Sequence, residues 1–418
     1  MNILKCCIIF AMTSFAIFNF GQAQWRHTDT LCTGNVNDLI EANGFLFACS
    51  GNGIYRSSDH GLHWNKTDNG INTKDVHSLG RLGTILFAGT ANEGIFFSTS
   101  NGAQWNDVSG GLSITNVTGF AVFPAKESGD LSVFATFHDT LYDGCVYRTT
   151  DTGSHWSSVS NGITNNDTRS LAVHDSALYV GTMGGVFLST DEGIVWTPMN
   201  SGLNVTYIVT LLARDTFLFA GTMTGGAYRT SNHGNSWEPI NNGLTNTYVN
   251  TFAATNTGLL FAGTGWSGVF LSTNNGTKWN TVSTGLTTSQ INALIVDSGG
   301  TYLYAATDDG VWYRPLSDMF TGTSGKNDLA PERMELLQNF PNPFNSSTTI
   351  HYSLSSTINV KLTMHDVLGR EIARLVNEIQ TVGWQEIKWN ASTVSSGIYF
   401  CRLQTGQHQQ LMKIAHIK

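Results

Sequence analysis

The sequence predicts an all-β protein in which a seven-bladed β-propeller is followed by a C-terminal, immunoglobulin-like β-sandwich. Three observations support this prediction. A pattern of about twelve residues that ends in Trp recurs six times between residues 53 and 279. Strand-like segments before the first copy and after the last copy together make up one more repeat. The last eighty or so residues lack the pattern and contain several short strand-like runs, which is typical of a small sandwich.

The pattern reads Gly-x-aromatic-x-Ser/Thr-x-Asp/Asn-x-Gly-x-x-Trp, and its period is that of one blade. Successive Trp residues lie 41, 51, 40, 41 and 42 positions apart, and about 40–45 residues form a four-stranded blade. We expect the Asp or Asn to bond its own backbone two residues on, the second Gly to supply a positive φ, and the Trp to anchor the next strand in the core. The second copy has Ser100 in place of the acid. The structural positions are Asp59, Gly61, Trp64, Gly102, Trp105, Asp151, Gly153, Trp156, Asp191, Gly193, Trp196, Asn232, Gly234, Trp237, Asn274, Gly276 and Trp279.

The two ends of the repeat region are predicted to close the propeller. Trp25 aligns with Trp64 but has no copy of the pattern before it, whereas residues 291–318 supply three strands and then lose the pattern at Pro315. We therefore expect the N-terminal strand to pair with Val311–Arg314 as the fourth strand of the last blade. Such closure hides both edges of the sheet. The third blade has about ten extra residues around Phe123–Gly144, either a functional loop or a tolerated insertion.

The repeat resembles the Asp-box, or BNR, repeat of sialidases, sortilin-type ectodomains, xyloglucanases and photosystem II assembly factors. The resemblance covers six copies and implies a propeller. It implies no chemistry, because the box of that superfamily lies on a turn away from the active face, and a shared fold does not carry function.

Beyond residues 319–334, a polar linker containing Gly, Ser and Pro, the sequence changes character. Residues 335–418 contain strand-like runs at Val360–His365, Glu371–Val376, Trp384–Trp389, Gly397–Leu403 and Leu411–Ile417. The pieces QNFPNPFN, STTIHYSL, the run Val360–Arg370 and SGIYFCRL resemble the type A sorting domain of the type IX secretion system of Bacteroidetes-like bacteria. This resemblance implies that the secretion machinery is a partner of residues 335–418. It also implies that the protein is secreted or held at the outer-membrane surface.

Composition agrees with export. Residues 1–23 have a basic residue, an apolar core and a small-x-small site at their end, and are predicted to be a signal peptide, so residues 24–318 form the propeller. Charged residues make up 12% of the chain, the net charge is −8, and no basic run points to nucleic acid. No later stretch is long and apolar enough for a transmembrane segment. Cys32 and Cys49 would pair if their strand ends meet, whereas Cys145 and Cys401 are expected to be lone strand residues. No cofactor or metal motif is present.

The sequence favours binding over catalysis. A sialidase needs three converging arginines, but Arg56, Arg148 and Arg229 fall on the third strand from the axis, and no Arg-Ile-Pro element is present. Paired carboxylates could serve a glycan-degrading hydrolase or lyase, yet nothing pairs the candidates on the loops. These are Asp75, Glu93, Asp167, Asp308 and Asp309. A structural or assembly factor is the third alternative.

We therefore expect a glycan or protein ligand to bind the face opposite the repeat turns. Aligning the residues that enter each innermost strand places Asp167, Tyr207 and Tyr248 at one position, and Arg169 two residues beyond it. Trp266 lies in a glycine-rich loop of the same blade as Tyr248, where it has little support for burial. Exposed aromatic rings beside hydrogen-bonding groups suit a sugar or an apolar anchor of a protein, although each ring could also pack on its own loop. The predicted binding residues are Tyr207, Tyr248, Trp266, Arg169 and Asp167.

Overall fold

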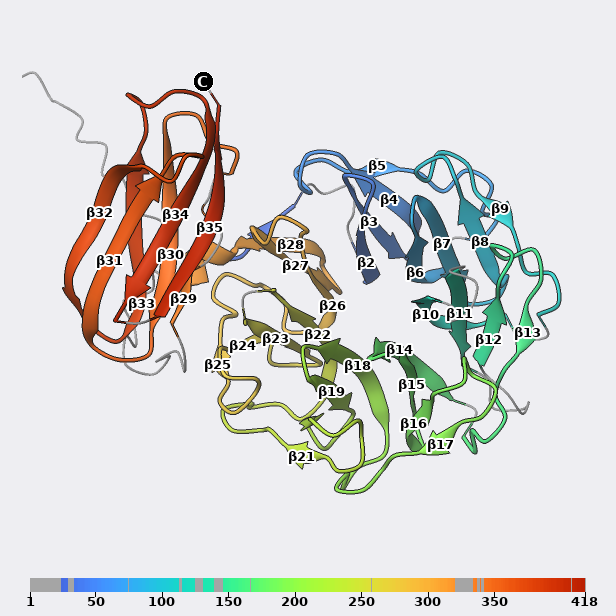
Figure 1. The fold of residues 1–418 in the computed structure, drawn as a ribbon. Helices are drawn as coiled ribbons and strands as arrows, with labels where there is room; N and C mark the ends of the chain where they lie inside the picture. The colour runs from blue at the N-terminus through green and yellow to red at the C-terminus, as the bar shows by residue number, and fades with distance from the viewer. Residues whose placement is uncertain are drawn as a thin grey trace, which may run out of the picture.

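The computed structural model describes residues 24–28, 34–73, 75–112, 115–124, 131–138, 146–165, 167–256, 258–319, 334–336, 339, 342–406 and 408–417. The chain forms a ring of β-sheets with a separate pair of sheets beside it, drawn in red in Figure 1. The predicted signal peptide, the predicted linker residues 320–333, Cys32, Cys145 and the blade 3 loops at 125–130 and 139–145 lie outside the described residues. None of the described residues belongs to a helix that is long and apolar enough to span a membrane.

The ring consists of seven four-stranded antiparallel sheets, as the repeat predicts. Blades 1 and 2 contain β2 (Val36–Ala42), β3 (Phe45–Ser50), β4 (Gly53–Ser57), β5 (Asn65–Lys66), β6 (Val76–Leu82), β7 (Ile85–Thr90), β8 (Ile95–Ser98) and β9 (Asn106–Asp107). Blades 3 and 4 contain β10 (Val117–Pro124), β11 (Leu131–Phe137), β12 (Val146–Thr149), β13 (Ser157–Ser158), β14 (Thr168–His174), β15 (Ala177–Thr182), β16 (Gly185–Ser189) and β17 (Thr197–Pro198). Blades 5 and 6 contain β18 (Ile208–Arg214), β19 (Phe217–Thr222), β20 (Ala227–Thr230), β21 (Glu238–Pro239), β22 (Val249–Ala254), β23 (Leu260–Thr264), β24 (Val269–Ser272) and β25 (Asn280–Thr281).

Blade 7 is closed by the N-terminal strand. Its order is β1 (Arg26–His27), β28 (Gly310–Pro315), β27 (Tyr302–Thr307) and β26 (Ile291–Val296), and the short 3-10 helix η2 (Leu316–Met319) follows. Arg26 pairs with Tyr313 and His27 pairs with Trp312. The predicted closure is therefore confirmed, and the outer edge of β28 is covered.

The turn between the third and fourth strand of a blade, here called the box turn, differs in one respect from the prediction. Asp59 Oδ1 accepts the backbone N–H of His63, four residues on, at 2.9 Å. The hydroxyl of Ser57 instead accepts the N–H of Gly61 at 2.9 Å. The expected bond of the Asp to the N–H two residues on is wrong because the serine two residues before the Asp occupies that N–H. The same pair of bonds is formed around Asp151, Asp191, Asn232, Asn274 and Ser100.

Each box turn also needs two consecutive residues with positive φ. Gly61 has a φ of 83°, and the residue before it, His60, has a φ of 58°. The predicted glycine is required because a β-carbon is strained in this region, but the left-handed conformation of the preceding residue was not predicted. The other five box turns repeat the pair, with a non-glycine residue followed by Gly102, Gly153, Gly193, Gly234 or Gly276.

The repeated tryptophans join each blade to the one before it. All six are at most 5% exposed, and the indole N–H of Trp105 donates to the carbonyl of Thr67 at 2.7 Å. Trp156, Trp196, Trp237 and Trp279 form the corresponding bond to Val108, Val159, Met199 and Ile240. Trp25 bonds the carbonyl of Val282, and Trp64 bonds the hydroxyl of Thr28. A buried indole N–H requires an acceptor, so these bonds satisfy seven donors and complete the ring.

The three arginines of blades 1, 3 and 5 reach sideways and do not converge on the axis. Arg56 Nη1 donates to the carbonyl of Asn101 in the next box turn at 2.7 Å. Arg229 does the same to Asn275, and Arg148 pairs with Glu192 of the next box turn. These arginines therefore link blades, as expected for residues on the third strand, and form no carboxylate-binding triad.

Asp38 is an ionisable residue of an innermost strand whose pKa is strongly shifted. Asp38 occupies the β-bulge of β2, and its two carboxylate oxygens accept the N–H groups of Leu39 and Leu79 at 2.8 and 2.9 Å. The corresponding bulges of blades 4 and 6 use the hydroxyls of Ser170 and Thr251 to accept the next blade's N–H. Burial raises the pKa of Asp38 to about 6 even though both backbone N–H groups lower it.

We predict that Asp38→Ser stabilises the propeller at neutral pH. A carboxyl whose pKa is higher in the folded than in the unfolded chain favours folding when protonated, so its contribution is present at low pH and is lost as the pH rises from about 4 to about 6. Above pH 6 the substitution removes a cost of about 1–3 kcal/mol, and below pH 4 the benefit disappears. Melting temperatures of both proteins between pH 4 and 8 test this. A constant difference across that range would contradict the prediction.

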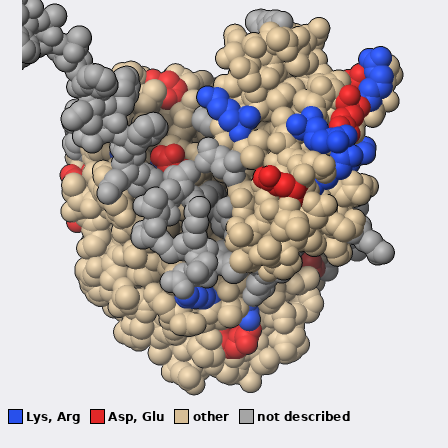
Figure 2. Space-filling model, turned by 90° about the vertical axis from the view of Figure 1, so that its left-hand side faces the viewer, with Lys and Arg blue, Asp and Glu red and all other residues tan. Residues whose placement is uncertain are grey.

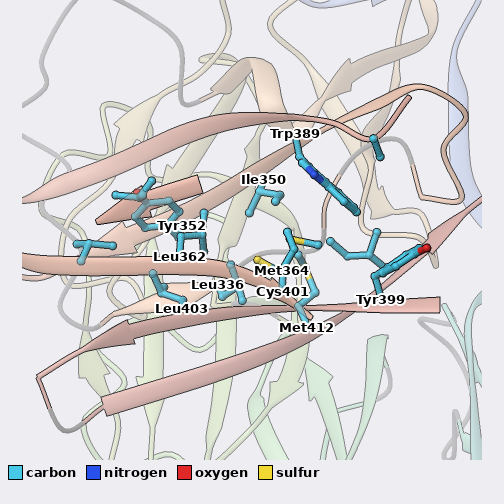
Figure 3. Packing of buried hydrophobic residues seen from close by; sticks show 14 of the residues in the cluster. Leu336, Ile350, Tyr352, Leu362, Met364, Trp389, Tyr399, Cys401, Leu403 and Met412 are labelled. Carbon is cyan, nitrogen blue, oxygen red and sulfur yellow. The ribbon is translucent and has the colours of Figure 1, made fainter. Parts of the chain in front are cut away.

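Residues beyond the propeller form two facing sheets with a common apolar core. One sheet has the order β29 (Glu335–Leu336), β30 (Ser347–Leu354), β33 (Gly383–Asn390). The other has the order β32 (Glu371–Gln380), β31 (Ile358–His365), β34 (Gly397–Thr405), β35 (His408–His416). Ile350, Tyr352, Leu362, Met364 and Cys401 are at most 1% exposed between the sheets (Figure 3). Cys401 is thus a buried strand residue, as predicted.

Several of these strands are longer than predicted. The strand expected over Glu371–Val376 continues as β32 to Gln380, where it still pairs with Ile358. Of the residues in β32 only Val376 is buried. The second half of β32 therefore carries polar residues, and in the sequence these residues resemble a loop. An open sheet face does not impose the alternation from which strands are predicted.

Charged side chains are sparse on the face of the molecule that Figure 2 shows. In the view of Figure 2, most of the described surface carries neither Lys or Arg nor Asp or Glu; Lys and Arg gather mainly at the upper right with some acidic residues among them, and the other Asp and Glu are scattered. In the sandwich, Asp366 pairs with Arg370, and Glu371 pairs with Arg374 and Lys361. These charges neutralise one another locally, so they make no single-sign surface for a nucleic acid.

Candidate ligand-binding site

On the face of the propeller opposite the box turns, two backbone positions lie side by side in blades 2 to 6. One is the entry residue, just before the innermost strand, and the other follows the second strand. Met183 donates its N–H to the carbonyl of Asp167 at 3.1 Å, and Met223 donates to Tyr207 at 3.1 Å. Gly265 bonds Tyr248, His138 bonds Asn116 and Ala91 bonds Asp75 in the same way. The alignment of entry residues made from the sequence therefore matches equivalent backbone positions.

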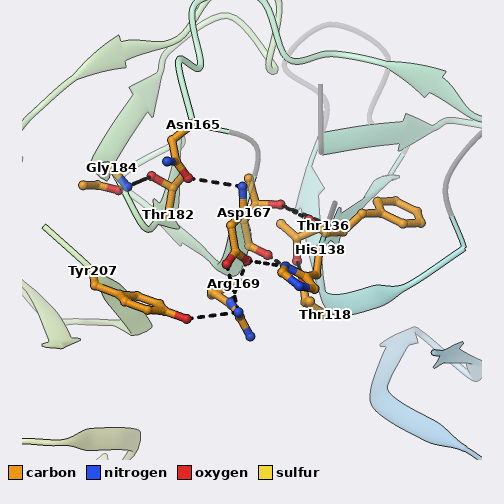
Figure 4. Close-up of polar contacts among 12 residues, drawn as sticks. Thr118, Thr136, His138, Asn165, Asp167, Arg169, Thr182, Gly184 and Tyr207 are labelled. Atoms are coloured by element: carbon orange, nitrogen blue, oxygen red, sulfur yellow. Dashed lines mark hydrogen bonds and ion pairs between the residues drawn. The ribbon is translucent and has the colours of Figure 1, made fainter. Parts of the chain in front are cut away.

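Arg169 is held in place by residues from two neighbouring blades (Figure 4). Its Nη2 donates to Asp167 Oδ2 at 2.9 Å and to the Tyr207 hydroxyl at 3.0 Å. Its Nε lies 2.7 Å from Asp167 Oδ1, and the guanidinium carbon lies 5.8 Å from the centre of the Tyr207 ring. The carboxylate already fixes one side of the guanidinium. Its remaining N–H groups can therefore bind a ligand with little further loss of side-chain entropy.

Asp167 also attracts a histidine from blade 3. The carboxylate side chain is 7% exposed, and His138 Nδ1 lies 2.9 Å from the same Oδ1 that faces Arg169. The His138 and Arg169 side chains are each about one-third exposed. Burial raises the pKa of Tyr207, whereas the nearby Arg169 lowers it. The Tyr207 hydroxyl thus stays protonated at neutral pH, so it can accept from Arg169 and still donate to a ligand.

Tyr248 and Trp266 form a second group on blade 6. Their ring centres lie 5.3 Å apart in an edge-on arrangement. A β-carbon on Gly265 would lie 2.6 Å from the Tyr248 ring, so this glycine lets the ring lie flat against the loop. Trp266 is 64% exposed, which contrasts with the buried tryptophans of the repeat. Tyr248 is partly buried and serves as its support.

Two methionines were not among the predicted residues but share this rim. Met183 is 42% exposed and Met223 is 38% exposed, and they lie next to Asp167 and Tyr207 through the backbone bonds described above. Apolar side chains thus follow one another over blades 4, 5 and 6. Their shared position directly after a Gly-Thr pair that recurs at the end of the second strand is the sequence signal that identifies them. We call Asp167, Arg169, Met183, Tyr207, Met223, Tyr248 and Trp266 the rim site.

Each of the other carboxylates expected on this face has a hydrogen-bond or ion-pair partner in its own blade or in the segment that leads into that blade. Glu93 accepts the N–H of Thr73 at 3.1 Å, and Asp75 lies 3.1 Å from His77. Asp309 accepts from Thr287 at 3.1 Å, and Asp308 accepts from Thr288. Asp167 is occupied by Arg169 and His138. Each of these five predicted carboxylates thus already has a neighbouring partner group.

Comparison with known families gives matches to both parts of the chain. Residues 338–418 match the secretion system C-terminal sorting domain, and residues 132–238 match the DUF6242 beta propeller domain. Curated protein sequences give no match.

Solved structures share the fold at low sequence identity. PorZ, an essential bacterial surface component of the type-IX secretion system of Porphyromonas gingivalis, is 15% identical with a TM-score of 0.54, over 92% of this chain and 60% of that one. The GH74 enzyme of Niastella koreensis is 17% identical with a TM-score of 0.53, over 69% and 44%. YCF48 bound to D1 peptide is 15% identical with a TM-score of 0.55, over 71% and 97%. The chain thus spans about 60% or less of the first two proteins.

The fold and the family matches agree on where the protein is delivered. A propeller with a polar, charge-poor surface precedes a sandwich whose sequence is that of a sorting domain. The chain is therefore an exported β-propeller protein, secreted or held at the cell surface of a Bacteroidetes-like Gram-negative bacterium, and its residues 338–418 form a secretion system C-terminal sorting domain.

Proposed function

We propose that this protein is a binding propeller whose rim site holds a protein or glycan ligand outside the cell. The observation that supports this most strongly is the exposure of Trp266, 64%, beside exposed Met183 and Met223 on consecutive blades. Large apolar side chains that are exposed together mark interaction sites. The repeat turns, whose bonding fits the Asp-box resemblance, keep the scaffold rigid behind this face.

The chemistry of the rim site suits two kinds of contact. Trp and Tyr rings can stack on the apolar face of a sugar or insert into a partner protein, and Arg169 can bind a carboxylate or hydroxyl group. Trp, Tyr and Arg are the residues that most often dominate binding energy at protein interfaces. Methionine adapts its shape to different apolar partners. A ligand with an apolar group next to an acceptor group would match this order of residues.

Two structures of the same fold illustrate the alternatives. YCF48 has been solved with a D1 peptide, so a propeller of this size can hold a polypeptide. The GH74 enzyme supports the second candidate, a glycan-degrading hydrolase, but the engaged carboxylates of the present chain do not favour it. Both likenesses concern the fold, and the rim site itself carries the proposal. We also propose residues 1–23 as the signal peptide, 24–318 as the propeller, 319–334 as the linker and 335–418 as the sorting domain.

We predict that Trp266→Ala and Tyr248→Ala weaken binding of the ligand by at least tenfold. Truncation of a central aromatic side chain at an interface typically costs 2 kcal/mol or more, and 1.4 kcal/mol is about tenfold in affinity. The ligand is first identified by screening the mature chain from Gln24 on glycan and protein arrays. Affinities of the variants are then measured by calorimetry.

Ile194→Ala provides the matched control. Ile194 is 62% exposed, almost as much as Trp266, but it lies in a box turn on the opposite face. Its removal should leave the affinity unchanged. If the Trp266→Ala and Tyr248→Ala proteins fold and still bind the ligand as tightly as the wild type, the binding surface lies elsewhere.

A further inference from the structure

The box-turn face carries a cluster that the ligand-binding proposal does not use. His174 ends β14, Asp175 begins the next turn, and His233 belongs to the box turn of the following blade. Donor atoms of all three lie within 4.8 Å of one another. Within the described part of the chain, no other set of three His, Cys, Asp or Glu side chains is gathered in this way.

We propose that His174, Asp175 and His233 bind a divalent transition cation of the zinc class and thereby clamp blade 4 to blade 5. Two imidazoles and one carboxylate are donors that zinc, copper and nickel accept readily. The hard cations calcium and magnesium prefer sites made of oxygen atoms alone. Nothing in the motif or the family matches assigns a metal to these residues.

The spacing of the donors is close to that of a coordination shell. Asp175 Oδ2 lies 3.6 Å from His174 Nε2 and 3.7 Å from His233 Nδ1. Metal–ligand bonds of about 2.0–2.2 Å place neighbouring tetrahedral donors roughly 3.3 Å apart. The exposed Asp175 and His233 side chains, 60% and 57%, need only small rotations to reach this spacing, because the buried His174 fixes one corner.

A backbone hydrogen bond of His174 limits how tightly a cation can bind. The carbonyl of Asp215, in the first turn of blade 5, accepts the N–H of His174 Nε2 at 2.9 Å. A cation on Nε2 would have to displace this carbonyl, because a metal bonded to the nitrogen at about 2.1 Å leaves no room for the hydrogen bond, and the proton would move to Nδ1 so that the imidazole stays neutral. His174 Nδ1 is buried and without a hydrogen bond among the described residues. We therefore expect weaker binding than at a zinc site whose histidines are all supported by acceptors.

The local charges permit the cation. Arg214 is the neighbouring positive group, and its Nε lies 3.2 Å from the carboxylate of Asp215 while Nη1 donates to the carbonyl of Gly258 at 3.1 Å. Its charge is thus partly neutralised by Asp215. The carboxylate of Asp175 lies beside both imidazoles and provides the negative charge that the cation requires.

The repeat supplies a built-in comparison at another blade junction. His60 holds the same box-turn position as His233, and a tyrosine hydroxyl donates to the carbonyl of each, from Tyr304 at 3.1 Å and from Tyr179 at 3.4 Å. The place of His174 is taken there by Asp297, whose Oδ1 accepts the N–H groups of Thr301 and Tyr302 at 2.6 and 2.7 Å. The two junctions share the box-turn histidine and the tyrosine bond to its carbonyl, but only the one at His233 has a second imidazole.

The test is zinc titration of the mature chain after treatment with EDTA, followed by calorimetry. We expect one equivalent of Zn²⁺ to bind with an accompanying rise in melting temperature, and Ca²⁺ to produce neither effect. His233→Ala and Asp175→Asn should weaken zinc binding more than tenfold, since even the loss of outer partners of metal ligands costs 10–100-fold. His60→Ala should leave it unchanged. The absorption spectrum of the Co²⁺-loaded chain should differ from that of the wild type in the same two variants.

The proposal is overturned if no zinc binds, or if His233→Ala and Asp175→Asn bind it as tightly as the wild type. It is also overturned if His60→Ala or His155→Ala lowers the affinity by the same factor, because zinc would then bind exposed histidines without preference. Both substituted side chains are exposed, so the variants should fold. Their melting temperatures without metal verify this.

Discussion

A mature chain that begins at residue 29 is expected to melt roughly 10 °C below the chain that begins at Gln24, or to aggregate before it melts. The deletion removes Trp25, which is 3% exposed, together with both pairs of the β1–β28 ladder. Loss of one buried Trp side chain alone costs about 3–5 kcal/mol, and 1 kcal/mol shifts the melting temperature of a domain of this size by about 2–4 °C.

The same deletion damages blade 1. The indole N–H of Trp64 donates to the hydroxyl of Thr28 at 3.2 Å, so the truncated chain leaves this buried donor without its acceptor. The edge of β28 becomes free to pair with another molecule. Scanning calorimetry and light scattering measure the two consequences. Removal of five residues between 320 and 333 is the control of equal length, and an unchanged melting temperature after loss of residues 24–28 would contradict the closure.

Trp25→Phe separates the indole bond from the strand. The phenyl ring keeps most of the apolar contact but cannot donate to the carbonyl of Val282, which the indole N–H reaches at 2.7 Å. We therefore expect a loss of about 1–3 kcal/mol for the unsatisfied carbonyl and the smaller ring, well below the effect of the deletion.

The period of the sequence was sufficient to predict the ring, the number of blades and the closing strand. Residues such as Gly61 and Trp64 have roles that follow from local chemistry, a left-handed turn and a large apolar anchor. The bonds between blades could not be predicted, because the acceptor of Trp105 is the carbonyl of Thr67, 38 positions earlier. A sequence pattern identifies which residue needs a partner, but the packing of neighbouring blades decides which atom provides it.

The candidate site could be predicted from the sequence only in part. Alignment of the entry residues identified Tyr207 and Tyr248 because their backbone positions repeat. His138 was missed as a neighbour of Asp167, since the extra residues of blade 3 obscure the alignment there. His174 and His233 lie 59 positions apart in the sequence (233 − 174), and nothing in their spacing indicates that two turns of adjacent blades bring them together. Sites made between repeats require the three-dimensional structure.

The sorting domain is expected to decide the destination of any protein to which it is attached. A chain that ends at residue 335 should fold as a propeller and accumulate in the periplasm. A reporter that carries a signal peptide and residues 335–418 at its C-terminus should pass to the outside of a bacterium that has the type IX system. The match of residues 338–418 to the sorting domain is the basis of this expectation.

Two substitutions in that reporter test whether the folded sandwich is required. Ile350 is fully buried in the core, so Ile350→Asp places an unpaired charge among apolar residues and should unfold the domain. Leu368 is 74% exposed, and Leu368→Asp makes the same chemical change on the surface. We expect the first variant to stay in the periplasm and the second to leave the cell, as measured by fractionation and blotting. Retention of the unmodified fusion in the periplasm would refute the sorting role, whereas export of both variants would show that the machinery recognises the unfolded segment.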